Sequence, residues 1–264
     1  QHKSLDQNTC AQIFSNESFF AAVYPMRTKA MAGQAFGEFI IDYGIPRQLM
    51  MDGASEQCKP NTEFMKKIKK YEVDYHLIEP ERHNHNRAES VIRELKKKWF
   101  RVMSRRKVPK RLWDYGLRWV ADIMQRSSNS VSSLRGRTPI EEVTGETPDI
   151  TEYLDFGFYD FVWYWENAGL GERQLGRWLG VSHRVGTQMC YYIIKHNGQV
   201  ISRTSVQCVT NLELQTDEVK ALCKETDTGI SNRLNDDQHV IIDGAKEQPT
   251  DWRGFDLSAD DDFH

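Results

Sequence analysis

The feature that most constrains the fold is a long amphipathic helix, predicted to begin near residue 87. Asn86 is a favoured N-cap, and Glu89 follows in the first turn. From Arg93 to Arg111 there are ten basic residues and one acidic residue. The apolar residues recur at helical spacing and predict one buried face, made of Ala88, Val91, Ile92, Leu95, Trp99, Val102 and Met103.

A second carboxylate precedes this helix, at the end of a predicted strand. The apolar run 49–51 indicates a short buried strand, which Asp52 ends before Gly53. Taken alone, Asp52 is explained by an Asp-Gly turn and Glu89 by helix capping. Taken together, a strand-end Asp and a helix-start Glu, separated by 36 residues, can bring two carboxylates to one metal site.

The surrounding periodicity predicts alternating strands and helices. We expect strands at 9–15, 18–26, 47–52 and 73–80 and helices at 29–44, 61–71 and 111–126, besides the long helix. The order β-β-α-β-α-β-α-α predicts an α/β fold with a mixed sheet flanked by helices.

The rest of the chain changes character twice. Residues 127–137 form a Ser-rich loop, and 156–212 turn to β character, with a two-residue hairpin at Asn197-Gly198. Residues 215–264 hold 13 acidic and 5 basic residues, whereas 1–214 hold 25 acidic and 30 basic. We therefore expect three regions: a core at 1–150, a small β-barrel-like module at 151–214, and an acidic linker or disordered tail at 215–264, with a short strand at 239–244.

Composition excludes several classes. Hydrophobic residues make up 39% and charged residues 28% of 264 residues, as in an ordinary soluble protein of one to two domains. No apolar run approaches the roughly 18 residues of a membrane span, and no signal peptide opens the chain. Five scattered Cys without a CxxC indicate a reducing compartment and no structural zinc. His83 and His85 lack an evident third ligand.

Three motifs in order resemble the integrase region of copia-like retrotransposon polyproteins, which are relatives of retroviral integrases. These are "IPRQLMMDGASEQ" (45–57), "HLIEPERHNHNRAESVIRELKKKW" (76–99), and "RTPIEEVTGETPDI" (137–150) followed by "FGFYDFVWYW" (156–165). The resemblance spans roughly residues 1–165. It implies a ribonuclease-H-like core, part of a transposable element's polyprotein, that acts in DNA integration.

The resemblance implies that Asp52 and Glu89 are catalytic and hold Mg²⁺ or Mn²⁺. Enzymes of this type use two such ions about 4 Å apart. Water first trims the 3′ ends of the element DNA, and the new 3′-hydroxyls then attack target DNA. The resemblance also implies that the partner is DNA, bound by a homo-oligomer, and no membrane partner is expected. It implies an intracellular setting, first in a cytoplasmic virus-like particle and then in the nucleus. The residues expected to bind DNA are Arg93, Lys96, Lys97, Arg101, Asn84 and Asn86.

One departure concerns the first Asp of the family's Asp, Asp, Glu triad. That residue lies on the first strand of the sheet, which we expect just upstream of Gln1. Asp6 is near the start but lies in a polar turn. We therefore expect the chain as given not to catalyse strand transfer. A truncated or decayed nucleic-acid-binding remnant is the alternative, and a ribonuclease H proper is disfavoured because the motifs match integrases.

Overall fold

The computed structural model describes residues 3–52, 59–78, 87–129, 134–166, 171–185 and 189–235. It divides into two compact units. The α/β unit comprises Asp6–Lys97 and Val120–Pro148, and the five-stranded unit comprises Gln1–Leu5, Lys98–Trp119 and Asp149–His264. No helix in the described part of the chain is long and apolar enough to cross a membrane.

The α/β unit opens with an antiparallel hairpin of β1 (Cys10–Ser15) and β2 (Ala21–Met26), which confirms both predicted strands. The side chain of Asn16 organises its turn by accepting hydrogen bonds from the Ser18 and Phe20 backbone amides at 3.0 and 3.2 Å. This is the local bonding that makes Asn a favoured turn residue.

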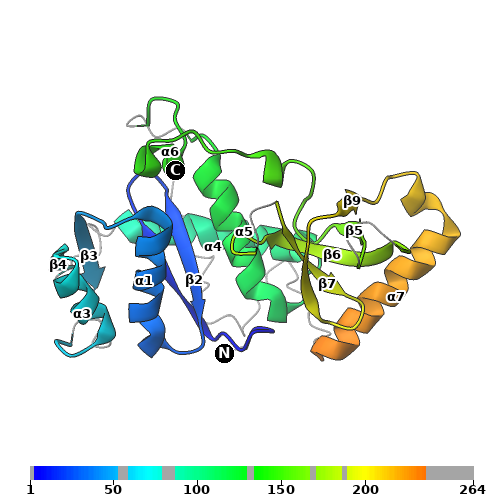
Figure 1. Ribbon diagram of the computed structural model, residues 1–264, viewed down its shortest axis with the longest axis horizontal. Helices are drawn as coiled ribbons and strands as arrows, with labels where there is room; N and C mark the ends of the chain where they lie inside the picture. Colours follow the sequence, from blue (N-terminus) through cyan, green and yellow to red (C-terminus); the bar gives the residue numbers. More distant parts are fainter. Residues whose placement is uncertain are drawn as a thin grey trace, which may run out of the picture. The chain divides into compact units, whose positions relative to one another are not determined.

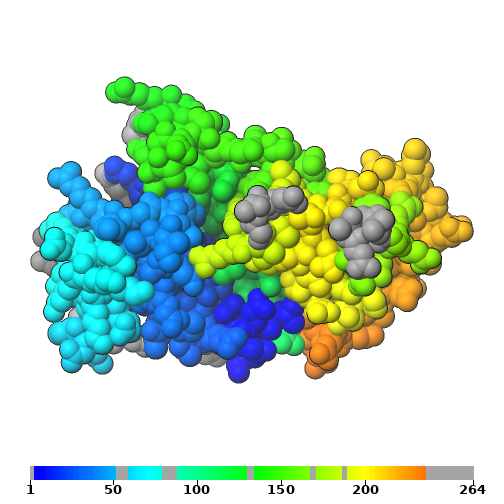
Figure 2. Space-filling view, viewed as in Figure 1, coloured from blue at the N-terminus to red at the C-terminus, as the bar shows by residue number. Residues whose placement is uncertain are grey.

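Helices α1 (Ala32–Tyr43) and α3 (Glu63–Lys70) pack together in this unit (Figures 1 and 2). The side chain of Thr62 caps α3 by accepting from the Met65 amide at 3.3 Å. The helices predicted at 29–44 and 61–71 are thus confirmed. With β1, β2 and β3 they form one core, whose buried aromatic side chains are Phe14, Phe20, Tyr24, Phe36, Phe39 and Phe64.

Strands β3 (Gln48–Asp52) and β4 (Asp74–Ile78) form a parallel pair. In the described residues this pair is not hydrogen bonded to β1–β2, so the four strands form two separate two-stranded sheets rather than the predicted single mixed sheet. Met50 is 63% and Leu77 53% exposed. The apolar run correctly indicated a strand, but its burial depends on neighbours that the local pattern does not specify.

The five-stranded unit contains an antiparallel sheet in the order β8-β7-β6-β5-β9. Its strands are β5 (Phe161–Tyr164), β6 (Gln174–Val181), β7 (Tyr191–Lys195), β8 (Val200–Arg203) and β9 (Val206–Cys208). Asn197-Gly198 turns β7 into β8, as predicted, with Gly198 at φ +76°. The sequence predicted a small β-barrel or curled-sheet module. Among the described residues β8 and β9 remain edges, so the sheet is not a closed barrel.

Residues 217–234, expected to belong to a linker or disordered tail, form helix α7 (Asp217–Leu234). Its buried residues recur at helical spacing, and it packs on β6 and β7 (Figure 1). Arg177 on β6 anchors it through two bonds to the Asp227 carboxylate at 2.9 and 2.7 Å. The strand expected at 239–244 lies outside the described residues.

The other helical elements of the described chain are the long helix α4 (Arg87–Arg105), α5 (Trp113–Arg126), α6 (Pro139–Thr144), and the short 3₁₀ turns η1 (Lys29–Met31), η3 (Lys110–Leu112), η5 (Thr151–Tyr153) and η6 (Glu213–Gln215). Thr138 and Glu141 form a reciprocal capping box at the start of α6. Thus the predicted order of strands and helices up to residue 126 is confirmed.

Candidate functional site

Asp52 is the last residue of β3, opposite Ile78 in the parallel register. Its position at the carboxyl end of the strand is the one predicted, but its side chain lies outside the described part of the structure. Gly53, Ser55 and Glu56, which follow Asp52 in the sequence motif, also lie outside it.

Glu89 lies in the first turn of α4 and is exposed to solvent. The helix begins at Arg87, directly after the predicted N-cap Asn86. A carboxylate in a first turn is stabilised by the helix dipole, whatever further role it has. The loop residues His83, Asn84, His85 and Asn86 lie outside the described ranges. The approach of the Asp52 and Glu89 carboxylates to within about 8 Å, which a shared metal pair requires, therefore stays a prediction.

The inward face of α4 fixes the orientation of the helix. Val91, Leu95, Trp99 and Met103 are all buried. The Trp99 indole N–H donates to the Trp113 carbonyl oxygen at 3.1 Å. Trp99 is thus a core residue, as its spacing predicted.

The predicted cations of α4 fall into two environments. Arg93 and Arg101 are exposed, whereas Lys96 and Lys97 are half-buried. Desolvation by burial lowers the pKa of Lys96. A cation on this helix can bind a phosphate. Burial disfavours the charged form of a side chain, so the exposed cations stay charged at a lower desolvation cost than the half-buried ones.

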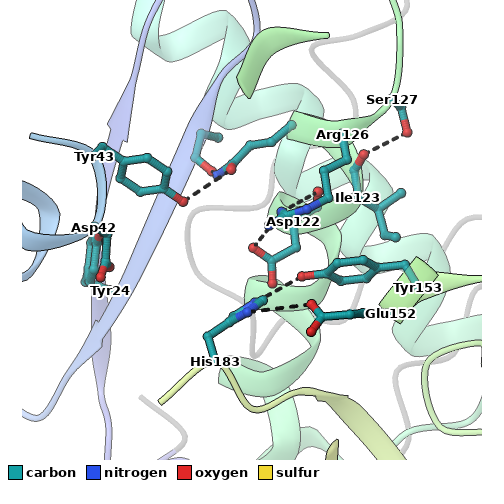
Figure 3. Close-up of polar contacts among 12 residues, drawn as sticks. Tyr24, Asp42, Tyr43, Asp122, Ile123, Arg126, Ser127, Glu152, Tyr153 and His183 are labelled. Atoms are coloured by element: carbon teal, nitrogen blue, oxygen red, sulfur yellow. Dashed lines mark hydrogen bonds and ion pairs between the residues drawn. The ribbon is translucent and has the colours of Figure 1, made fainter. Parts of the chain in front are cut away.

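A polar cluster in the five-stranded unit was not predicted. The Tyr153 hydroxyl lies 3.0 Å from His183 Nε2, and His183 Nδ1 lies 3.9 Å from a Glu152 carboxylate oxygen (Figure 3). An imidazole between a phenol and a carboxylate can relay a proton. Tyr153 is buried, however, so the contact ties η5 to the end of β6. Thirty residues separate Tyr153 from His183, and no spacing pattern signals such a pair.

Within the ranges that the structure describes, no three His, Cys, Asp or Glu side chains gather as a metal-binding group. The Asp52 side chain is outside those ranges, so this finding does not bear on the predicted Asp52–Glu89 site.

Comparisons with solved structures reveal distant structural similarity. No protein-family model matches the sequence, and a search of curated proteins finds no match. Among solved structures, the chain is similar to one from the cryo-EM structure of a simian T-cell lymphotropic virus intasome in complex with PP2A regulatory subunit B56 gamma. The identity is 10% over 76% of this chain and 80% of that chain, with a TM-score of 0.34. A TM-score of this size assigns neither fold nor function.

Proposed function

We propose that this protein is the core region of an integrase similar to those of copia-like retrotransposons, and that it performs metal-dependent phosphodiester chemistry on DNA. The observation that supports the proposal is the position of two acidic residues in the secondary structure. Asp52 ends β3 of a parallel pair, and Glu89 opens the helix that follows β4. The carboxyl ends of parallel strands share one edge of a sheet, where α/β folds bind their ligands.

We extend this proposal to a ribonuclease-H-like fold, in which β3–β4 is part of a larger mixed sheet. Two observations support it. A two-stranded parallel sheet is rare on its own, since parallel sheets are normally buried on both faces. The apolar side chain of Met50 on β3 is nevertheless exposed.

The proposed donor set fits a hard cation. Carboxylate oxygens are the ligands that Mg²⁺ and Mn²⁺ prefer, so Asp52 and Glu89 would hold the metal. Bound ions would activate the attacking oxygen and stabilise the leaving oxygen. The chain's own cations would hold the DNA backbone through its phosphates, using Arg93, Lys96, Lys97 and Arg101, with Asn84 and Asn86 positioning the substrate. The attacking groups would be water in end processing and a DNA 3′-hydroxyl in strand transfer, within a homo-oligomer on DNA.

The alternative is a nucleic-acid-binding remnant that keeps the fold and the basic helix but not the chemistry. One observation favours it: neither β1 nor β2 contains a carboxylate, and Asp6 is an exposed turn residue. A remnant needs no third carboxylate, whereas an enzyme that holds two ions does.

The test compares Asp52→Asn and Glu89→Gln with the matched control Glu94→Gln, which also removes a carboxylate from α4. Mn²⁺ binding is measured by calorimetry. We expect both site variants to weaken Mn²⁺ binding, because each removes a carboxylate ligand, whereas Glu94→Gln should leave Mn²⁺ binding unchanged.

Three outcomes would change the assignment. Equal effects of Glu94→Gln would remove the specific role of Glu89. DNA binding without Mn²⁺ binding by the unchanged protein would favour the remnant. Efficient cleavage of an RNA–DNA hybrid would indicate a ribonuclease H instead.

A further inference from the structure

Two segments of the five-stranded unit, far apart in the sequence, each expose a pair of apolar side chains. The first segment is η5 with its flanking residues, where Ile150 and Leu154 are exposed, Leu154 over 68% of its surface. The second segment joins β6 to β7, where Val185 and Met189 are exposed. We call these four side chains the η5 face. All four belong to the same compact unit of the chain.

Contacts between the two segments make the η5 face one surface. The Tyr153 hydroxyl bonds to His183, as described above, and so fixes η5 against the end of β6 (Figure 3). Farther along both segments, the Phe156 ring packs edge to face on Tyr191, with the ring centroids 5.2 Å apart. The Tyr191 hydroxyl donates in turn to the Met189 sulfur. Because the segments are joined at two points, the apolar side chains that adjoin these contacts lie near one another.

Acidic residues border the η5 face. Asp149 and Asp155 are exposed, and Glu152 is half-buried. Hydrogen bonds from Thr151 lower the pKa of Asp149, so this carboxyl is ionised at neutral pH. Burial raises the pKa of Tyr191 to about 12, and the charges of Asp155 and Glu152 add to the rise, so both carboxylates lie close to the joined segments.

The basic groups of the two segments do not cancel this charge. In the described residues of these segments they are Arg184 and His183. Arg184 already has an interaction, and His183 lies between Tyr153 and Glu152. With histidine counted as neutral, three carboxylates stand against one cation. The border of the η5 face is therefore negatively charged.

The negative border excludes several classes of partner. Phosphate groups, whether of nucleic acid or of an anionic membrane surface, meet like charges there, and like charges across an interface weaken association. The chain's own residues 236–264 are equally unsuited, because they contain nine acidic and two basic residues. A partner for this face needs apolar side chains to cover the exposed ones and positive charges to match the border.

We propose that the η5 face binds a basic amphipathic helix of another protein. Apolar side chains that recur every three or four residues along such a helix form a stripe, which covers the four exposed side chains. The Lys or Arg residues beside the stripe pair with the carboxylates of the border. Exposed apolar patches rimmed by polar residues typically mark protein-binding sites, and the flexible Met189 side chain can adapt to its partner.

The elements that form the face favour a helix over an extended peptide as the partner. The η5 face consists of a 3₁₀ turn and a connection between two strands. Its exposed groups are side chains, so the partner contributes a surface of side chains rather than an added strand. The inference requires neither a metal ion nor DNA, so it is independent of the proposed function.

The experiment measures the affinity of the full chain for a labelled peptide of leucine and lysine by fluorescence anisotropy. The peptide has about 18 residues, or five helical turns, and its leucines form one stripe. The variants are Leu154→Ser, Val185→Ser and Asp155→Asn. The matched control is Leu212→Ser, because Leu212 is 77% exposed in the same unit but its neighbour Glu213 is paired with Arg173. Circular dichroism confirms that each variant is folded.

A second control concerns the acidic residues near the end of the chain, which also attract a basic peptide. Replacing Asp260, Asp261 and Asp262 with asparagine removes three of the nine carboxylates of residues 236–264 and leaves the η5 face unchanged. A peptide with glutamate in place of lysine tests the sign of the charge. A peptide of the same composition without an apolar stripe tests the helix pattern.

We expect Leu154→Ser and Val185→Ser to weaken binding of the striped basic peptide at least about fivefold, because each removes an apolar anchor. Asp155→Asn should weaken binding at low salt and have less effect at high salt, where charges are screened. Leu212→Ser and the triple asparagine variant should stay within about twofold of the parent chain. The glutamate peptide and the peptide without a stripe should both bind at least about tenfold more weakly.

Unchanged affinity in Leu154→Ser, an equal loss in Leu212→Ser, or a loss caused mainly by the triple asparagine variant would overturn the proposal. Binding to anionic phospholipid vesicles that Leu154→Ser abolishes would assign the face to a membrane surface instead. Self-association that Leu154→Ser abolishes would assign it to a second copy of the chain.

Discussion

At the scale of single residues, Arg177 concentrates several interactions in one side chain. Its guanidinium binds both carboxylate oxygens of Asp227 and the Tyr159 carbonyl oxygen, the last at 2.7 Å. It also lies over the Phe161 ring, 3.3 Å from the ring centroid. A planar, permanently charged group is needed for this combination, and lysine cannot reproduce it.

We predict that Arg177→Met and Arg177→Lys both destabilise the five-stranded unit by about 2 kcal/mol, because the charge-assisted bonds to Asp227 are lost. The matched control is Arg173→Met, since Arg173 binds Glu213 at 2.8 Å but is about half exposed. It should cost under about 1 kcal/mol. Urea unfolding followed by tryptophan fluorescence measures both. Equal losses at the two positions would show that Arg177 has no special role.

Tyr43 gives a prediction for alkaline pH. Its hydroxyl donates to Gln125 at 3.2 Å, and burial raises its pKa to about 12. The folded state thus disfavours the phenolate, so the stability is fully present below the ordinary tyrosine pKa of about 10 and is lost as the pH rises toward 12. In Tyr43→Phe the decline in unfolding free energy between pH 10 and 12 should become shallower. A decline as steep as in the parent chain would contradict this account.

At the scale of elements, helix α7 shows where composition misleads. Its acidic sequence suggested a linker, yet Val219, Thr226, Ile230 and Leu234 keep helical spacing and are buried. The helical spacing of buried residues was present in the sequence but involved few positions, so the acidic composition of the segment led to the prediction of a linker. By contrast, α1 and α3 were predicted correctly because their apolar faces are dense.

Two helical glycines should respond oppositely to the same substitution. A Cβ at Gly229 of α7 would overlap the backbone carbonyl oxygen of His196, whereas one at Gly37 of α1 would meet only the flexible end of Lys67. We expect Gly229→Ala to destabilise by about 1–3 kcal/mol. Gly37→Ala should be neutral or stabilise by up to about 1 kcal/mol through helix propensity. Thermal unfolding of the two variants tests this prediction. A change in unfolding temperature of the same sign in both variants would contradict the close approach of α7 to the β7–β8 turn.

At the scale of the whole molecule, the sequence predicted local structure well and non-local pairing poorly. The strand around Met50 follows from its own apolar residues, but which strands adjoin it depends on segments far away in the chain. The same holds for the residues of the candidate site. The start of α4, which places Glu89 in its first turn, was predicted from a local capping signal, whereas the contact between Tyr153 and His183 has no local signature.

The separate strand pairs give a prediction for hydrogen exchange. Two-stranded sheets are marginal alone, so backbone amides of β3 and β4 should exchange faster than those of β6 and β7, the inner strands of the larger sheet. Exchange measured by mass spectrometry tests this. Equally slow exchange in β3 would mean that a further strand or a partner covers its edge.

The discontinuity of the α/β unit bears on the order of events during synthesis. Its first segment ends at Lys97, but its core also includes Ile140, which belongs to the second segment beginning at Val120. A ribosome adding about 5–20 residues per second needs roughly 2–9 seconds to pass from one to the other. Through that interval the nascent first segment must leave part of its apolar surface uncovered. During this interval the uncovered apolar surface is accessible to chaperones. Slowing translation between codons 98 and 140 should lengthen the interval.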